Sequence, residues 1–294
     1  MLVLAACAKP AGKNASTKKR VLVTTSFLQD MVQQVAGDSV DIELMIPAGA
    51  DPHLYEAKPE DHRKLQEADL VLYHGLHFEG KMVEALESKG IAVSKQFPQE
   101  RLGKMDEDGE IITDPHFWFD LQLYSMAVSE ATDALIGLAP EKKEDFTKAK
   151  EAYQKQLEEL DAEIKTKIGS LPKESRYLIT PHDAFNYFSR NYDIEVKAPQ
   201  GVSTESETSN QDIQETIDFI VEHKVKAVFA ESTTDPARME KLREGVAAKG
   251  WEVKVVKGEG QELFSDSLAP KGEDGDQFIT MYRHNVDLIV KNLQ

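Results

Sequence analysis

The stretch EKKEDFTKAKEAYQKQLEELDAEIKTKI, residues 141–168, decides how this chain is organised. Its apolar residues recur at the spacing of an α-helix among many charged ones. They are Phe146, Ala149, Ala152, Tyr153, Leu157, Leu160 and Ile164. Because a helix rises about 1.5 Å per residue, one of this length crosses a whole small domain. The stretch therefore predicts a rigid strut joining two parts of the chain.

Before the strut, short β-branched segments alternate with helical ones. Strands are expected at residues 21–24, 40–46, 70–73 and 91–93, and helices at 26–36, from 59 onward, at 80–88 and at 122–138. Ser26 can cap the first helix, and Gly37 ends it. This alternation predicts a parallel sheet flanked by helices.

Beyond Pro172 the same rhythm resumes. Strands are expected at residues 177–179, 194–196, 227–230 and 253–256, and helices at 183–192, 211–223, 236–249 and 276–292. A chain of 294 residues exceeds the usual size of one core. We therefore expect an α/β protein whose two lobes, residues 21–139 and 171–294, each hold a parallel four-stranded sheet flanked by helices, with residues 140–170 as the connecting helix.

The charge balance excludes one class of partner. The chain has 35 Lys and Arg against 52 Asp and Glu, a net charge of -17, which argues against a basic nucleic-acid-binding face. Acidic runs at 141–145 and 158–161 are typical of solvated helix faces. No segment after the N-terminus approaches the roughly 18 to 20 apolar residues that span a bilayer.

The only cysteine, Cys7, offers no disulfide and no cysteine-based metal cluster. The sequence Leu4-Ala5-Ala6-Cys7 matches a lipobox, in which the cysteine is lipidated; the alternative is a chance cysteine in an apolar N-terminus. Six preceding residues are too few for a full signal peptide. We therefore interpret residues 1–20 as a truncated lipoprotein signal followed by a flexible tether.

Two identical tripeptides, Asp51-Pro52-His53 and Asp114-Pro115-His116, stand in separate predicted loops, with Pro181-His182-Asp183 as a looser third copy. Proline fixes its own φ and restricts the residue before it, so each histidine sits on a stiffened corner. Taken singly, each copy is an ordinary turn. Together they indicate a metal site, and two of the histidines follow predicted strands, where ligands of α/β sheets bind.

Four motifs in order carry a family resemblance: DPHLYE at 51–56, DPHFWFD at 114–120, HDAFNYF at 182–188 and LFSDSL at 263–268. This series resembles the TroA-like solute-binding lipoproteins of ABC transporters, the zinc and manganese receptors, from about Val21 to the C-terminus. The resemblance implies a helical strut in place of hinge strands. It also implies a monomeric receptor, not an enzyme, that delivers metal to a membrane permease with its own ATPase.

The resemblance further implies one divalent ion, Mn²⁺ or Zn²⁺, held by His53, His116, His182 and Asp266. Taken alone, Asp266 between two serines is an ordinary turn residue, and only the resemblance selects it. Zinc-specific relatives commonly carry a His-rich loop before the second motif, whereas residues 104–113 contain acids and no histidine, which favours manganese slightly. The softness of imidazole favours zinc.

A ligating imidazole usually donates its other N–H to a carboxylate or carbonyl. The carboxylates that are candidates for this role are Asp51, Asp114, Asp120, Asp183 and Glu231.

The remaining histidines and the aromatic residues of the second motif have simpler interpretations. His74 and His77 are expected to pack or hydrogen-bond at a strand end. Surface positions on helices are expected for His62, His223 and His284. Phe117 and Trp118 are expected either to exclude water from the cleft or to pack between the lobes.

The function that follows is metal capture at the outer face of the cytoplasmic membrane, with a lipid anchor. One rival is a secreted zinc metallohydrolase with Glu231 as base, but no His-Glu-x-x-His pattern is present. Another is a surface adhesin, which no sequence feature tests.

Overall fold

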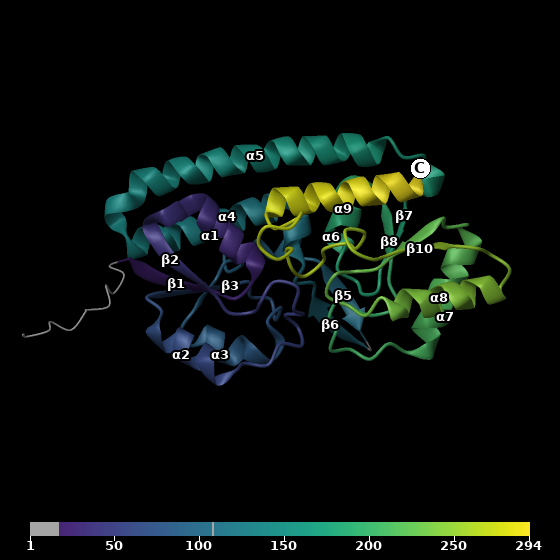
Figure 1. Cartoon of the computed structure of the whole chain (residues 1–294), viewed down its shortest axis with the longest axis horizontal. Helices are drawn as coiled ribbons and strands as arrows, with labels where there is room; N and C mark the ends of the chain where they lie inside the picture. Colours follow the sequence, from purple (N-terminus) through teal and green to yellow (C-terminus); the bar gives the residue numbers. More distant parts are fainter. Residues whose placement is uncertain (1–17, 108) are drawn as a thin grey trace, which may run out of the picture.

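A computed structural model describes residues 18–107 and 109–294, which form two α/β lobes side by side along one long helix (Figure 1). This helix, α5 (Lys143–Gly169), has 27 residues, is preceded by the 3-10 turn η5 (Pro140–Lys142), and runs over both lobes. The expected strut is thereby confirmed. Its buried face includes Phe146, Tyr153 and Leu160, which belong to the predicted apolar stripe.

The first lobe is built on a parallel four-stranded sheet, in the order β2-β1-β3-β4. Its strands are β1 (Lys19–Val23), β2 (Val40–Leu44), β3 (Leu70–Tyr73) and β4 (Ile91–Ala92). Its helices are α1 (Ser26–Ala36), α2 (Pro59–Glu67), α3 (Val83–Glu87), which follows the 3-10 turn η2 (Gly80–Met82), and α4 (Leu121–Leu138). The expected parallel sheet flanked by helices is confirmed.

The side chains of β1 point alternately to the two faces of this sheet, and helices cover both faces. Val21 and Val23 pack into the core that contains the buried residues of α1, α4 and α5. Leu22 points to the opposite face, where it joins Leu65 of α2 and Leu86 of α3. Successive side chains of a strand point to opposite faces, so one apolar run serves two layers.

The second lobe contains the four expected strands, but they do not form one hydrogen-bonded four-stranded sheet. They form two parallel pairs of three-residue strands, β7–β8 and β9–β10, with β7 next to β9. The strands are β7 (Tyr177–Ile179), β8 (Glu195–Lys197), β9 (Ala227–Phe229) and β10 (Lys254–Val256). The helices are α6 (Asn186–Tyr192), α7 (Asn210–Glu222), α8 (Ala237–Ala248) and α9 (Phe278–Leu293). Helix α9 lies against α5, so two helices back this lobe.

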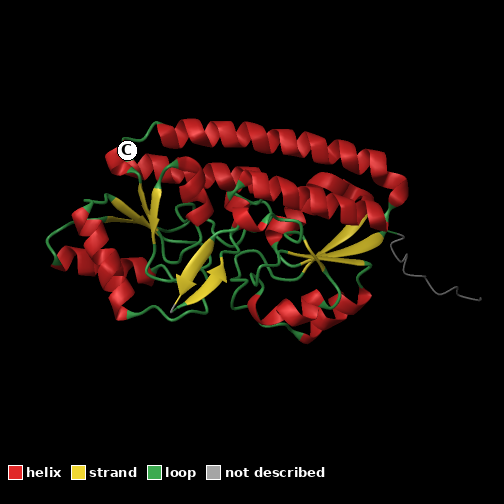
Figure 2. Ribbon diagram, turned by 180° about the vertical axis from the view of Figure 1, so that it is seen from behind, coloured by secondary structure: helices red, strands yellow, loops and turns green. Residues whose placement is uncertain are grey.

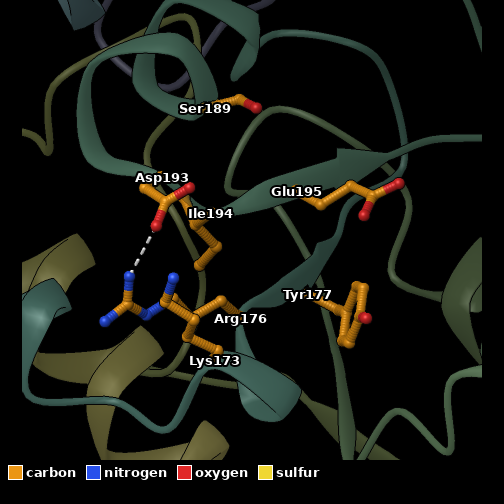
Figure 3. Close-up of a pocket in the computed structure, with 7 residues that line it drawn as sticks. All are labelled: Lys173, Arg176, Tyr177, Ser189, Asp193, Ile194 and Glu195. Atoms are coloured by element: carbon orange, nitrogen blue, oxygen red, sulfur yellow. Dashed lines mark hydrogen bonds and ion pairs between the residues drawn. The ribbon is translucent and has the colours of Figure 1, made fainter.

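A surface pocket of about 330 Å³ lies where β7 and β8 begin (Figure 3). Its lining includes Arg176, whose guanidinium lies 2.9 Å from the Asp193 carboxylate. Ligands of parallel sheets bind at the carboxyl ends of strands. This pocket lies at the amino ends, away from the predicted metal-binding residues, and is not a candidate site for the metal.

Residues 104–113, expected as a loop, form an antiparallel hairpin instead. Its strands are β5 (Lys104–Glu107) and β6 (Glu110–Thr113), and Gly109 in its turn has a φ of 88°. The hairpin lies between the sheets of the two lobes (Figure 2). It ends directly before Asp114, so the second Asp-Pro-His turn leaves a regular element and not a loose loop.

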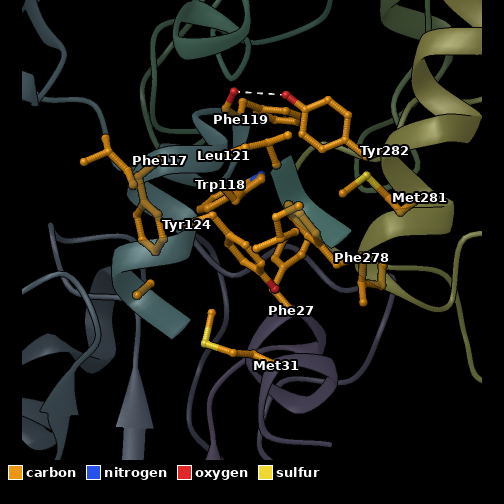
Figure 4. Close-up of a cluster of buried hydrophobic side chains, with 14 of the residues drawn as sticks. Phe27, Met31, Phe117, Trp118, Phe119, Leu121, Tyr124, Phe278, Met281 and Tyr282 are labelled. Carbon is orange, nitrogen blue, oxygen red and sulfur yellow. Dashed lines mark hydrogen bonds between the residues drawn. The ribbon is translucent and has the colours of Figure 1, made fainter. Parts of the chain in front are cut away.

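An aromatic cluster joins the lobes into one continuous core (Figure 4). The Phe27 ring of α1 stacks on Trp118 with centroids 4.9 Å apart, and Tyr124 of α4 stacks on Phe278 of α9 at 3.8 Å. The Tyr282 hydroxyl of α9 donates to the Phe119 carbonyl at 3.0 Å. Because the Tyr124–Phe278 and Tyr282–Phe119 contacts cross the lobe boundary, large separation of the lobes would expose buried aromatic surface.

The start of α1 differs from the expectation in an informative way. The cap is Thr25, whose hydroxyl accepts from the Leu28 N–H at 3.4 Å, and not Ser26. Ser26 turns instead towards the second lobe. At the other end Gly37 ends the helix as expected, with a φ of 51°.

Within the described residues, no helix is both long and apolar enough to cross a membrane. The proposed lipidation site, Cys7, and most of the proposed tether lie outside those residues.

Candidate metal centre

Four side chains from distant parts of the chain converge between the lobes. They are His53, His116, His182 and Asp266, and one potential ligand atom from each lies within 4.8 Å of all the others. His53 has 2% of its surface exposed and the other three have none. Two come from the first lobe and two from the second, which is the set selected from the sequence. They form the one such cluster among residues 18–107 and 109–294.

The Asp266 carboxylate lies at the centre of this cluster. Its Oδ1 is 3.3 Å from Nε2 of His116, and its Oδ2 is 3.1 Å from Nε2 of His182 and 3.8 Å from Nε2 of His53. None of these five atoms has a hydrogen-bond partner outside the cluster in the part of the chain described. Buried polar atoms almost always have one. Three imidazole nitrogens and a carboxylate aimed at one point are a donor set for a divalent transition metal.

Both Asp-Pro-His turns position their histidine by the same backbone contact. Oδ1 of Asp51 accepts from the His53 N–H at 2.9 Å, and Oδ1 of Asp114 accepts from the His116 N–H at 2.9 Å. An aspartate that bonds the backbone two residues on forms an Asx turn, which explains why both tripeptides begin with aspartate.

The ring orientation of two histidines is fixed by carboxylates behind them. Nδ1 of His116 lies 2.8 Å from Oδ1 of Asp114, and Nδ1 of His182 lies 2.6 Å from Oε2 of Glu231. A carboxylate accepts the Nδ1 proton and leaves the Nε2 lone pair free for a metal. Asp114 and Glu231, two of the five candidates, therefore lie where a partner of a ligating imidazole belongs.

The other candidates differ. Asp51 contacts the backbone of its histidine, as described above, and its Oδ2 accepts from the Thr204 hydroxyl of the second lobe at 2.6 Å. For Asp183 the structure shows contacts of its backbone, with Asn186 and Gly201, and no side-chain bond to a histidine of the cluster.

Asp120 must be reassigned. Its carboxylate caps α4 by accepting from the Gln122 and Leu123 N–H groups, and it pairs with Arg101 and Arg190 at 3.1 and 2.8 Å. A helix cap with two arginine partners is a structural role, and the described contacts of this carboxylate include no histidine of the cluster. The 3-10 turn η4 (Phe117–Phe119) separates Asp120 from His116 along the chain.

The cluster strongly perturbs proton affinities. Burial lowers the pKa of His53 to about 3. Burial also acts to lower the pKa of His116, but the adjacent Asp114 and Asp266 outweigh it and raise that pKa to about 9. The same balance, with Glu231 and Asp266 as partners, raises the pKa of His182 well above its usual value. Against the effect of burial, His182 and His116 hold the pKa of Asp266 well below its usual range.

His74 approaches this centre without joining it. It is fully buried, its Nε2 lies 2.7 Å from the Thr25 hydroxyl, and its ring packs against Phe78 and Trp118 with centroids 4.8 and 5.1 Å away. It therefore packs and hydrogen-bonds at the end of β3, as expected.

Among the peripheral histidines, only His62 is exposed, as expected. The expectation of surface positions is wrong for the other two, which are half-buried. His223 packs on Phe219 at 4.3 Å, and Nε2 of His284 contacts the Glu262 carbonyl at 3.0 Å.

Trp118 serves both roles considered for it. Its ring meets His116 edge-on at 5.2 Å and closes one side of the cluster, while its indole N–H donates to the Ser265 carbonyl of the second lobe at 2.9 Å. Phe117 is also fully buried and packs against Phe97.

A cavity of about 480 Å³ adjoins the cluster at His53. It is lined by both lobes, with His77 and Ile111 on one side and Val202 and Glu205 on the other. His53, the one member of the cluster with any exposed surface, is thus the candidate ligand nearest to solvent.

The site geometry agrees with comparisons to known proteins. The family model for ZnuA, zinc-uptake complex component A periplasmic, matches residues 21–292. The chain belongs to this family. The resemblance found in the four motifs is thereby confirmed over nearly the whole chain.

Two relatives of this ZnuA-family protein are named for different metals. The zinc-binding protein TroA of Treponema pallidum (strain Nichols) is 42% identical over 95% of this chain and 90% of its own length. The manganese-binding lipoprotein MntA of Bacillus subtilis (strain 168) is 36% identical over 97% of this chain and 92% of its own. A solved TroA structure superposes with a TM-score of 0.93 at 62% identity, covering 95% of this chain and all of that one.

Proposed function

We propose that this protein captures one divalent transition-metal ion, Mn²⁺ or Zn²⁺, between its lobes and delivers it to the permease and ATPase of an ABC transporter. The observation that carries the proposal is the convergence of three imidazole Nε2 atoms and two carboxylate oxygens, all buried and without hydrogen-bond partners outside the cluster among the described residues. In this proposal His53, His116, His182 and Asp266 are the ligands. Asp114 and Glu231 orient two of the imidazoles.

The division of ligands between lobes supports capture over catalysis. An ion bound by two groups from each lobe holds the lobes together, and the shared aromatic core limits how far they part. Glu231, the base of the hydrolase alternative, is engaged by His182 at 2.6 Å. The family and the named relatives are binding proteins for metal uptake, which confirms the expectation that this chain is no enzyme.

The choice of metal stays part of the proposal. We expect manganese as the physiological cargo because the hairpin before the second motif has no histidine. Zinc is the stronger binder at imidazole sites in general, so it can exceed manganese in affinity without being the cargo.

The proposed place of action is outside the cytoplasm. Relatives such as the MntA lipoprotein support an extracytoplasmic protein. We propose that Cys7 carries the lipid that holds this monomer at the outer face of the cytoplasmic membrane.

Metal titration after stripping tests the function. Protein freed of metal by a chelator should take up one Mn²⁺ or Zn²⁺ per chain and unfold at a higher temperature. Saturation at a thousandfold excess over Kd stabilises by about 4 kcal/mol. Replacement of the exposed His62 with Ala is a matched control that should leave uptake unchanged. Absence of stabilisation by any divalent transition metal would overturn the proposal.

A further inference from the structure

Apart from the imidazoles that face it, no described group bonds either oxygen of the Asp266 carboxylate. Its location depends on the backbone on either side. Before it, Phe264 is held on the second lobe by Asn285 of α9, whose side chain bonds both the Phe264 N–H and its carbonyl, at 2.9 and 2.8 Å. The residues that immediately flank Asp266 are held differently.

The following residue, Ser267, is held by the first lobe. Its hydroxyl oxygen accepts from the Gly49 N–H at 2.7 Å and lies 3.1 Å from the Ser26 hydroxyl oxygen. The next N–H, of Leu268, donates to Ser26 at 2.9 Å. All three contacts are buried or half-buried and cross the lobe boundary.

Each hydroxyl proton in these contacts has one acceptor. Ser267 donates its hydroxyl proton to the Leu268 carbonyl at 2.9 Å, which leaves its oxygen as acceptor for Gly49 and Ser26. Ser26 then donates to Ser267 and accepts from Leu268. Neither hydroxyl has a proton to spare or an unmet donor facing it, so the arrangement is a complete network.

The preceding residue, Ser265, is also held by the first lobe, through the Trp118 indole N–H on its carbonyl at 2.9 Å. Its hydroxyl also contacts its own lobe, at Thr233 over a long 3.5 Å and at the Glu231 carboxylate. The residues on both sides of Asp266 therefore make contacts with first-lobe groups. Asp266 belongs to the second lobe by sequence, but the segment around it is held by both lobes.

We propose that Ser26 and Ser267 are positioning residues that form a hydroxyl clasp, which holds Asp266 against the histidines and slows metal release. The proposal rests on the proposed function, in which Asp266 is a ligand. Gly49, the third member of the clasp, lies two residues before the Asp51-Pro52-His53 turn. The clasp thus joins the loop of one first-lobe ligand to the loop of the second-lobe carboxylate.

The test compares metal release with stability of the metal-free protein. Ser267→Ala and Ser26→Ala each remove one hydroxyl of the clasp, and Ser209→Ala is the matched control. Ser209 caps α7 by accepting from the Asp212 N–H at 3.1 Å, in an exposed position away from the cluster. Dissociation rates come from a chelator chase of the loaded protein, and stability from urea unfolding of the stripped protein.

We expect Ser267→Ala and Ser26→Ala to release metal roughly tenfold to a hundredfold faster, the range for loss of a partner that orients a ligand. The double variant should be no worse than the more severe single one, because both belong to one network. Ser26→Thr, which keeps a hydroxyl, should restore most of the slow release. Ser209→Ala should lose stability and keep the wild-type release rate.

Unchanged release from both clasp variants, or release that rises in Ser209→Ala as much as in them, would overturn the clasp. Failure of the wild-type protein to bind any divalent metal would instead overturn the proposed function, and the clasp with it. The two failures are distinguishable because the first requires a loaded wild-type protein.

Discussion

The two Asp-Pro-His turns have the same sequence and the same backbone hydrogen bond, yet their aspartate side chains make different further contacts. Asp114 is fully buried and also contacts Nδ1 of His116 at 2.8 Å. Asp51 makes no such ring contact in the structure, and its second oxygen bonds Thr204 instead. The second oxygen of Asp114 likewise reaches the other lobe, where it accepts from Asn186 at 3.1 Å.

This difference teaches that the tripeptide specifies a turn, while the tertiary environment specifies the chemistry of the imidazole. One copy yields a histidine whose pKa is about 3 and the other a histidine whose pKa is about 9. Each aspartate links its turn to the second lobe, so both histidines are oriented most firmly when the lobes are docked.

The largest effect is expected from loss of the imidazole of either turn, because each turn contributes one histidine to the proposed metal site. A site worth about 10–16 kcal/mol shared among four ligands loses roughly 3 kcal/mol per ligand, about a hundredfold in affinity. His53→Ala and His116→Ala should both reach this level in competition with a fluorescent chelator. Near-wild-type affinity in either would remove that histidine from the site.

Of the two turns, only the second should contribute to the pH dependence of metal binding. The folded pKa of His116, about 9, exceeds its ordinary 6.5, so its proton stabilises the metal-free protein below pH 6.5 and that gain is lost as pH rises through 9. A metal must displace this proton, so affinity should rise between pH 6.5 and 9, by up to about tenfold per pH unit for each displaced proton. His182, whose pKa is also raised, adds to this slope.

Calorimetry in buffers of different ionisation enthalpy counts the released protons. At neutral pH His53 should contribute none, since burial already keeps it neutral. Binding without proton release at pH 7 would contradict the assigned proton states of His116 and His182.

Replacing each aspartate by asparagine separates the two turns directly. Asparagine keeps an oxygen that can accept the backbone N–H, so both turns should survive. Asp114→Asn removes the carboxylate behind His116 and should weaken metal binding about 10–100-fold. Asp51→Asn should cost only a few-fold, a loss near the roughly 1 kcal/mol of an ordinary hydrogen bond. Equal losses in the two variants, measured by metal competition, would show that the turns are equivalent.

The smallest effect is expected from Thr204→Val, which removes the hydroxyl that Asp51 accepts and preserves the side-chain shape. Loss of this cross-lobe bond should weaken binding by a few-fold, in line with about 1 kcal/mol. Combined with Asp51→Asn it should add nothing, because both changes break the same contact. Additive losses would mean that Thr204 acts through another partner.

Much of the fold is predictable because it depends on local pattern. The apolar stripe of α5 and the strands of both lobes follow from periodicity, which is a property of short segments. The hairpin at residues 104–113 is not predictable in this way, because its exposed Ile111 and charged neighbours lack a clear alternation of apolar and polar residues. Ser26 illustrates the same limit, since a hydroxyl at a helix start resembles a cap until its partner in the other lobe is known.

The residues of the site also differ in how far local sequence marks them. The stiff Asp-Pro-His corners mark His53 and His116 by local chemistry, whereas Asp266 is recognisable only by resemblance to a family. The roles of Asp114 and Glu231, and the contacts of Ser267 and Thr204, depend on segments that are distant in sequence and meet only after folding.

The most direct test of a single ion shared between the lobes is a crystal structure of the metal-loaded protein with anomalous data at the manganese and zinc edges. The account predicts one anomalous peak per chain, about 2.0–2.2 Å from Nε2 of His53, His116 and His182 and from an oxygen of Asp266. A peak held by residues of one lobe only, or a loaded protein in which Asp266 does not contact the metal, would contradict it.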